Sequence, residues 1–101
     1  MPRLAVSEQA EDDLHAITAC MAEQDGKLRA RKATARLLKA MDNLAFMPGI
    51  GSRRYYLDTA SRAFPVPPWL IVYELLPEGD CVRVLRIIDG RRDIAYLFGD
   101  E

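Results

Sequence analysis

The sequence predicts a single α+β domain over residues 1–101, with the element order β-α-α-β-β-β and a short C-terminal tail. In residues 8–47, apolar side chains recur every three or four positions, as they do in amphipathic helices. After Pro48, runs rich in Val, Ile, Leu and aromatic residues alternate with turn sequences, as they do in strands. We therefore expect an N-terminal strand, then an antiparallel pair of helices packed on a small, mostly antiparallel sheet.

The two helices are predicted from their ends and their apolar stripes. Residues 3–6 can form an edge strand, and the hydroxyl of Ser7 can cap a helix over residues 8–24. A second helix is predicted over residues 27–47, ended by Pro48-Gly49. The break between the helices is so short that they should lie antiparallel. The expected buried stripes are Ala10, Leu14, Ile17 and Met21 in the first helix, and Ala30, Ala33, Leu37, Met41 and Leu44 in the second.

The stretch from Trp69 to Asp93 should form the centre of the sheet. Its two apolar runs flank residues 77–80, Pro-Glu-Gly-Asp, which is typical of a hairpin with a four-residue loop. Residues 62–66 are predicted as the preceding strand, because Pro67-Pro68 leaves room only for a tight connection. For a symmetric hairpin loop, the opposed pairs would be Glu74 and Arg83, Tyr73 and Val84, and Ile71 and Arg86.

Both faces of this hairpin are apolar, whereas an antiparallel sheet in a small domain usually buries only one. One helical layer covers one face, so the second needs a partner protein, self-association or the chain's own C-terminal segment. The sequence leaves these alternatives open. One face carries Trp69, Ile71, Tyr73, Leu75, Val82, Val84, Arg86 and Ile88, and the other carries Leu70, Val72, Leu76, Cys81, Leu85 and Ile87.

The composition excludes several classes of function. The formal net charge is −1, which argues against a protein that grips nucleic acid with its whole surface, and we expect no direct sequence-specific binding to nucleic acid. No apolar run approaches the roughly 20 residues of a membrane helix, and the N-terminus lacks the pattern of a secretory signal, so a cytoplasmic location is predicted. Cys20 and Cys81 lie at apolar positions and are predicted to be buried thiols.

Other candidate sites are weak. Residues 49–52, Gly-Ile-Gly-Ser, lack the spacing and the Lys-Ser or Lys-Thr ending of a phosphate-binding loop, so we expect no nucleotide site there. No metal site and no cofactor are expected. On the second helix, spacings of three and four predict one basic ridge, which can be a solvated face or can pair with acids of the first helix. This basic ridge consists of Arg29, Lys32, Arg36 and Lys39.

Several segments together carry a family resemblance: SEQAEDDLHAI, FMPGIGSRR, RAFPV, LIVYEL and VRVLRIIDGRRDIAYLF. In order and spacing they resemble the ParE-type toxins of the ParE/RelE superfamily of bacterial toxin–antitoxin modules, over nearly the whole chain. The resemblance implies the RelE/ParE-like fold and neutralisation by a cognate ParD-like antitoxin whose C-terminal segment wraps the toxin. We assign the antitoxin contact to Trp69, Ile71, Tyr73 and Val84.

The resemblance leaves two kinds of target, because ParE-type toxins poison DNA gyrase and RelE-type toxins cut mRNA on the ribosome. RNA cleavage needs an acid, a base and cations near the phosphate. Arg62 and the arginines near the C-terminus could supply cations, and Tyr96 lies four residues after Arg92, as in RelE-type toxins. Against a nuclease, His15 is the single histidine, and Asp89 stands where ParE-like chains often have His.

We therefore predict a toxin without enzymatic activity that binds DNA gyrase. The alternatives that stay open are a RelE-like ribosome-dependent mRNA endonuclease and a non-toxic interaction domain of the same fold. Each arginine could instead serve an internal salt bridge, such as Arg83 with Glu74. The candidate residues for target contact are Arg86, Arg91, Arg92 and Tyr96.

Overall fold

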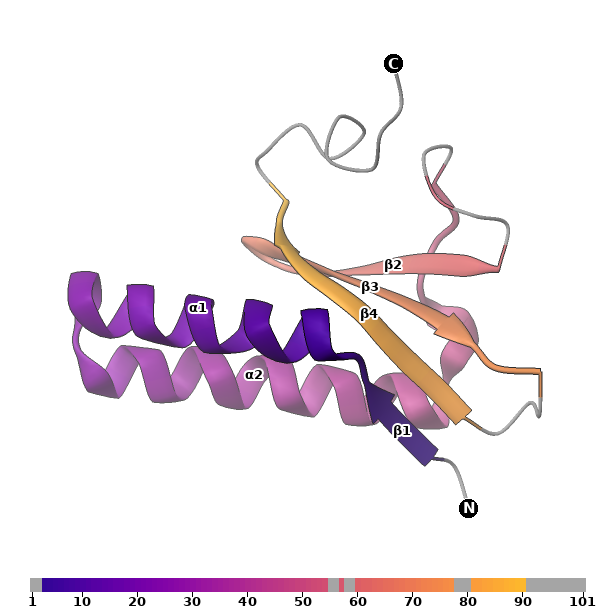
Figure 1. Cartoon of the computed structure of the whole chain (residues 1–101), viewed down its shortest axis with the longest axis horizontal. Helices are drawn as coiled ribbons and strands as arrows, with labels where there is room; N and C mark the ends of the chain where they lie inside the picture. Colours follow the sequence, from indigo (N-terminus) through magenta and orange to yellow (C-terminus); the bar gives the residue numbers. More distant parts are fainter. Residues whose placement is uncertain (1–2, 55–56, 58–59, 78–80, 91–101) are drawn as a thin grey trace.

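The computed structural model (Figure 1) describes residues 3–54, 57, 60–77 and 81–90. Its element order confirms the predicted fold class, and the helix and strand bounds agree with the sequence-based ones to within one residue. No helix among the described residues is long and apolar enough to cross a membrane. The elements are β1 (Arg3–Val6), α1 (Glu8–Asp25), α2 (Lys27–Phe46), the 3-10 turn η1 (Pro48–Ile50), β2 (Ser61–Val66), β3 (Trp69–Leu75) and β4 (Cys81–Asp89).

The described strands form one mixed sheet in the order β1-β4-β3-β2. The two hairpin pairs, β2 with β3 and β3 with β4, are antiparallel, whereas β1 pairs with β4 in parallel. The N-terminal strand is therefore an edge strand, as predicted. In Figure 1 the two helices run antiparallel, side by side, along one face of this sheet.

Ser7 joins the start of α1 to the sheet. Its side-chain oxygen accepts a hydrogen bond of 3.0 Å from the Ala10 amide, which is the predicted helix cap. The same hydroxyl donates to the Leu85 carbonyl oxygen at 2.8 Å, and the Ser7 amide donates to the Val84 carbonyl oxygen at 2.9 Å. The sequence predicted the cap but not the contact with β4.

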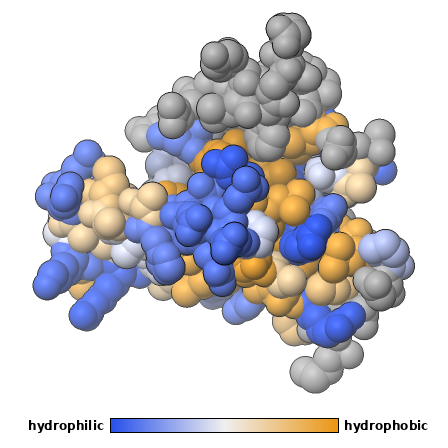
Figure 2. Space-filling model, viewed as in Figure 1, coloured by the Kyte–Doolittle hydropathy of each residue, from blue (hydrophilic) through white to orange (hydrophobic). Residues whose placement is uncertain are grey.

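The main core lies between the helices and the sheet. The predicted stripes of both helices face this core, although Ala30 is buried outside the core cluster. Figure 2 shows hydrophilic surface over the first half of α1, where Glu8 and Glu11 lie in the first turn. The buried members of the core are Ala10, Ala33, Leu37, Ala40, Met41, Leu44, Val66, Trp69, Ile71, Tyr73, Val82, Val84 and Ile87.

The predicted register of the β3-β4 hairpin is right in only one half. Tyr73 lies opposite Val84 as expected, but the register then shifts, so that Arg86 lies opposite Val72 and not opposite Ile71. The shift leaves Leu85 as an extra residue in β4, which is a β-bulge. Because side chains alternate along a strand, the extra residue turns Ile87 toward the helices and Ile88 toward the opposite face.

The second face of the sheet is buried within the chain. The second core cluster consists of Ala63, Leu70, Val72 and Ile88, which are at most 6% exposed, and Leu57 and Leu85 pack against it. These residues therefore do not need a partner protein to leave water, as one sequence-based alternative had required. The C-terminal segment, which was the other alternative for covering this face, lies outside the described residues from residue 91 onward.

Tyr73 fixes the loop after α2 to the sheet. Its buried hydroxyl accepts a hydrogen bond of 2.9 Å from the Gly51 amide and donates one of 2.6 Å to the Pro48 carbonyl oxygen. Arg62 donates to the Gly51 carbonyl oxygen at 2.9 Å. A Cβ atom on Gly51 would lie only 2.7 Å from Tyr73 Cε1, so the tyrosine ring occupies the space that a side chain would need. Gly51 therefore has a structural explanation, which does not extend to Gly49.

The first prediction concerns this close contact. Gly51→Ala should lower the free energy of unfolding by about 1–3 kcal/mol, because the new methyl group overlaps a buried ring. Gly49→Ala is the matched control, since a Cβ atom there meets nothing within 4 Å. Urea unfolding of the two variants measures the difference, and equal losses would contradict the packing of Tyr73 against Gly51.

The second prediction concerns the ionisation of Tyr73. Burial raises the pKa of its phenol, against the opposing effects of the Gly51 amide and the Arg62 charge. The folded chain therefore keeps this proton at a pH where the unfolded chain, with a tyrosine pKa of about 10, has begun to lose it. The contribution of the Tyr73 phenol to the free energy of unfolding should therefore be complete below about pH 10 and should fall as the pH rises above that value.

The matched variant is Tyr73→Phe. It should be less stable at pH 8 by about 1–3 kcal/mol, because the Gly51 amide and the Pro48 carbonyl lose a buried partner. Between pH 9 and 11 it should lose less stability than the wild type. Urea unfolding at a series of pH values measures both effects, and parallel pH profiles would contradict the second.

Candidate functional site

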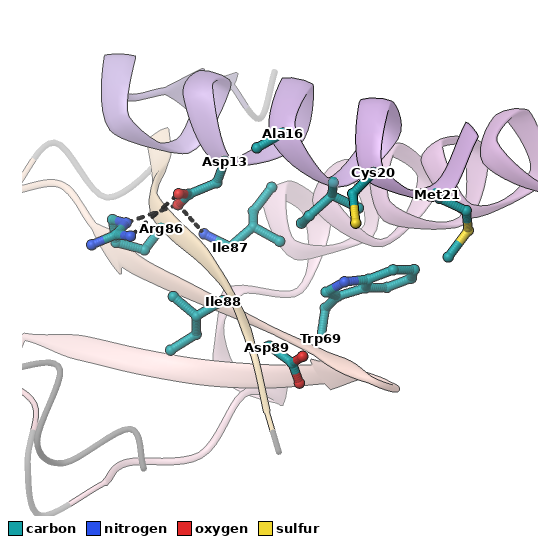
Figure 3. A pocket seen from close by; sticks show the side chains of 10 residues that line it. Asp13, Ala16, Cys20, Met21, Trp69, Arg86, Ile87, Ile88 and Asp89 are labelled. Carbon is teal, nitrogen blue, oxygen red and sulfur yellow. Dashed lines mark hydrogen bonds and ion pairs between the residues drawn. The ribbon is translucent and has the colours of Figure 1, made fainter. Parts of the chain in front are cut away.

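The predicted target-contact residue Arg86 lies where the bulged part of β4 packs against α1. Its guanidinium binds the Asp13 carboxylate with two nitrogens, Nε to Oδ2 at 2.8 Å and Nη2 to Oδ1 at 3.2 Å. The Ile87 amide donates to the same Oδ2 at 2.9 Å (Figure 3). Asp13 comes one turn after the buried Ala10, which places it at the edge of the helix face that covers the sheet.

The electrostatics of the pair indicate a structural contact. The hydrogen bond to Asp13 raises the pKa of Arg86, burial lowers it, and the charge of Asp13 raises it further. The side chains of Arg86 and Asp13 are 37% and 18% exposed, so water screens the pair only in part. For Arg86, the structure thus supports the alternative of an internal salt bridge.

Four consecutive residues of β4, Val84 to Ile87, are bonded to Ser7 and Asp13 at the start of α1. Ser7 binds the carbonyl groups of Val84 and Leu85, and Asp13 binds the Arg86 side chain and the next amide. These bonds surround the extra residue of the bulge. The start of α1 therefore fixes the path of β4 toward its C-terminal end.

A groove of about 330 Å³ lies between α1 and this part of the sheet. It has the Asp13 and Arg86 pair on one side and Asp89 on another, while the Trp69 ring lies below Cys20 and Met21 (Figure 3). The groove thus combines charged groups of both signs with an aromatic surface. Its lining residues are Asp13, Ala16, Ile17, Cys20, Met21, Trp69, Arg86, Ile87, Ile88 and Asp89.

The residues predicted to bind an antitoxin are in the interior. Trp69 is 7% exposed and borders the groove, whereas Ile71, Tyr73 and Val84 are 0% exposed. All four belong to the core that the helices cover, so their burial does not fit the predicted role. The sequence did contain a signal that these residues are buried. The apolar stripes of the two helices must pack on an apolar surface, and the more apolar face of the hairpin is the one available.

The other predicted target-contact residues cannot be placed, whereas the predicted salt bridge on the hairpin can. Arg91, Arg92 and Tyr96 lie outside the described residues. The predicted pair of Arg83 and Glu74 is present, with Arg83 Nη2 2.9 Å from Glu74 Oε2.

Other side chains that the sequence singled out also have defined positions. In the basic ridge, Arg36 donates to the Pro67 carbonyl oxygen at 3.0 Å. Cys81 is buried as predicted, but Cys20 is exposed, so its assignment as a buried thiol was wrong. His15 is exposed on α1. Within the described ranges, no group of three or more His, Cys, Asp or Glu residues could hold a metal ion.

Similar folds occur in solved toxin structures. A chain of the chromosomal ParDE toxin–antitoxin system from P. aeruginosa matches with a TM-score of 0.75 and 22% identity, over 88% of this chain and 96% of that chain. The isolated E. coli RelE toxin matches with a TM-score of 0.62 and 17% identity, over 96% and 93% of the two chains. The chain therefore has the fold of the RelE/ParE superfamily.

The sequence comparisons identify the family within this superfamily. Residues 4–94 match the family described as the ParE toxin of the type II toxin–antitoxin system parDE. The chain is also 30% identical over 101 residues to Toxin ParE3 of Caulobacter vibrioides, covering 100% of this chain and 99% of that protein. This chain belongs to the ParE toxin family of type II toxin–antitoxin systems.

The third prediction tests the contact between α1 and β4. Asp13→Ala should lower the free energy of unfolding by about 1–3 kcal/mol, because it leaves a half-buried guanidinium and the Ile87 amide without their acceptor. Arg86→Ala should cost less, since Asp13 keeps its bond from the amide. The exposed pair offers a control, Arg83→Ala, which should cost about 0–1 kcal/mol. Chemical unfolding measures all three, and equal losses for Asp13→Ala and Arg83→Ala would contradict the structural role of Asp13.

Proposed function

We propose that this chain is a toxin that inhibits DNA gyrase inside the bacterial cell and is neutralised by a cognate ParD-like antitoxin. The observation that carries the proposal is the ParE family match over residues 4–94. The similarity to Toxin ParE3, at 30% identity over nearly the full length of both proteins, supports it. ParE-type toxins act on gyrase, so the family favours this target over the ribosome.

The contacts of the candidate catalytic side chains also favour a protein-binding toxin over an RNA-cutting one. Arg86 is bound by Asp13, and Arg62 donates to the Gly51 carbonyl oxygen. The other candidates, Arg91, Arg92 and Tyr96, lie outside the described residues. Arg86 and Arg62 thus support the fold, whereas RNA cleavage needs cations and a proton donor directed at a phosphate. The net charge of −1 also gives little attraction for RNA.

We assign the gyrase contact to the residues that follow β4. Arg91 and Arg92 come directly after Gly90 in the sequence, and Tyr96 follows them. The Gly90 amide donates to the Pro68 carbonyl oxygen at 2.7 Å, so the chain leaves the described part of the fold from a fixed point. In this proposal Arg86 holds β4 against α1 and does not itself bind gyrase.

The proposed antitoxin is supported by solved structures of toxin–antitoxin systems that contain a similar fold. The intact E. coli RelBE toxin–antitoxin complex matches this chain with a TM-score of 0.61 and 17% identity, over 91% of this chain and 100% of that chain. The ParDE system from P. aeruginosa is a second such case. A toxin of this family without an antitoxin would stop the growth of its own host, which is the physiological reason to expect the partner.

The fourth prediction tests the target and the contact residues together. The purified chain should inhibit DNA supercoiling by gyrase, and Arg91→Ala with Arg92→Ala should weaken that inhibition at least about tenfold, equivalent to about 1.4 kcal/mol of binding. The control removes two exposed cations of the basic ridge, Arg29→Ala with Lys32→Ala, and should leave inhibition unchanged.

Two results would contradict the fourth prediction in different ways. Unchanged potency of the Arg91→Ala and Arg92→Ala variant would remove these residues from the site. Cleavage of mRNA on translating ribosomes, without inhibition of gyrase, would favour the RelE-like alternative. In cells, a DNA damage response on expression of the chain should accompany growth arrest if gyrase is the target.

A further inference from the structure

The C-terminal half of β4 has a strand neighbour on one side only. β1 pairs with β4 as far as Val84 and ends at Val6, whereas β3 pairs with β4 up to Asp89. Beyond Val84, one edge of β4 therefore has no neighbouring strand among the described residues. An open strand edge presents backbone donors and acceptors that need other partners.

Two side chains at the start of α1 take the place of the missing neighbour. The Ser7 hydroxyl donates to the Leu85 carbonyl oxygen at 2.8 Å. The Asp13 carboxylate accepts from the Ile87 amide at 2.9 Å and from two nitrogens of Arg86. Among the described contacts from α1, these Asp13 bonds lie furthest along β4 (Figure 3).

The Asp13 contact is of a kind that fixes a strand. A carboxylate bound by two nitrogens of one guanidinium has a defined orientation as well as an attraction. The Asp13 side chain is 18% exposed and Ile87 is 2% exposed, so water competes little for the bond between them. Because this bond goes to the main chain, it restrains the strand itself and not only a side chain.

The end of the hairpin formed by β3 and β4 is thereby tied to α1. Ile87, Ile88 and Asp89 pair with β3, and the Gly90 amide donates to the Pro68 carbonyl oxygen at 2.7 Å. A strand advances about 3.3 Å per residue, so Gly90 lies roughly 10 Å beyond Ile87, and a tilt of the backbone at Ile87 displaces Gly90.

We propose that Asp13 is a positioning residue for the target contact. By holding Arg86 and the Ile87 amide, it sets the direction in which the chain leaves β4 toward Arg91 and Arg92, and it does not itself touch the target. This inference rests on the gyrase contact proposed above and adds to it a residue on α1. A contact segment that is not held in place must be ordered on binding, which lowers its affinity.

The fifth prediction compares variants of the purified chain in their inhibition of DNA supercoiling by gyrase. Asp13→Ala should weaken inhibition at least about tenfold, because the segment that carries the contact is then ordered only on binding. Asp13→Asn should weaken it less, since the side-chain oxygen of asparagine can still accept a hydrogen bond from the Ile87 amide.

A control with a similar loss of stability is available away from β4. Gly51→Ala should also lower the free energy of unfolding, but it does so through the Tyr73 ring on β3. At a temperature where thermal unfolding shows that both variants are folded, Gly51→Ala should leave the inhibition unchanged, whereas Asp13→Ala should not.

A double-mutant cycle separates positioning from general stabilisation. If Asp13 acts through Arg91 and Arg92, Asp13→Ala should cause little further loss when both arginines are already alanine. If Asp13 only stabilises the fold, the losses should add. Isothermal titration calorimetry of each variant with purified gyrase measures the same cycle as a binding affinity.

Amide hydrogen exchange provides a measurement that does not involve gyrase. In Asp13→Ala, the amides of Ile87 and Gly90 should exchange faster by a larger factor than the amides of the core strands, because the end of the hairpin opens locally. In Gly51→Ala, these two amides should change by no more than the core strands do.

Each outcome has its own meaning. Equal loss of inhibition in Asp13→Ala and Gly51→Ala, additive losses in the cycle, or no local change in exchange at Gly90 would each overturn the positioning role. If the wild-type chain inhibited gyrase and the losses were additive, the positioning role alone would be wrong. If the wild-type chain did not inhibit gyrase, the proposed target would be rejected and this inference with it.

Discussion

The rest of this fold depends on the hydrogen bonds that the Asp13 carboxylate accepts. One side chain accepts three hydrogen bonds from β4, two from the Arg86 guanidinium and one from the Ile87 amide. These bonds hold a strand that carries one extra residue, and without the extra residue Ile87 would face away from the helices. An ionic contact between α1 and β4 therefore decides which apolar side chains of β4 reach each core.

The same constraint explains why a thin domain can bury both faces of its sheet. The bulge divides the two isoleucines that end β4, so that Ile87 joins the helix-facing core and Ile88 joins the opposite cluster. Tyr73 is part of the first core, while its hydroxyl holds the loop at Gly51 by hydrogen bonds. The arginines near these contacts are consequently used to maintain the fold. A sequence rich in arginine on its strands therefore need not be a phosphate-binding one.

The sequence predicted those features that depend on local patterns. The Ser7 cap, the helical stripes, the order of the elements along the chain and the pair of Glu74 with Arg83 follow from spacing and turn chemistry alone. The parallel pairing of β1 with β4 was not predicted. The bulge was missed because its bonds come from Asp13, 73 and 74 residues away in sequence. The four residues assigned to the antitoxin contact are instead covered by the chain's own helices, because an apolar pattern does not tell whether its cover comes from the same chain or from a partner.

The same bonds set where the chain leaves the sheet. Asp13 holds the Ile87 amide, and the Pro68 carbonyl oxygen accepts a hydrogen bond of 2.7 Å from the Gly90 amide, so the last strand is held on both sides of Ile88 and Asp89. Arg91 and Arg92, to which we assign the gyrase contact, follow Gly90 directly in the sequence. Loss of the Asp13 carboxylate should therefore act on the target contact through the path of β4, because Asp13 itself binds only β4 among the described contacts.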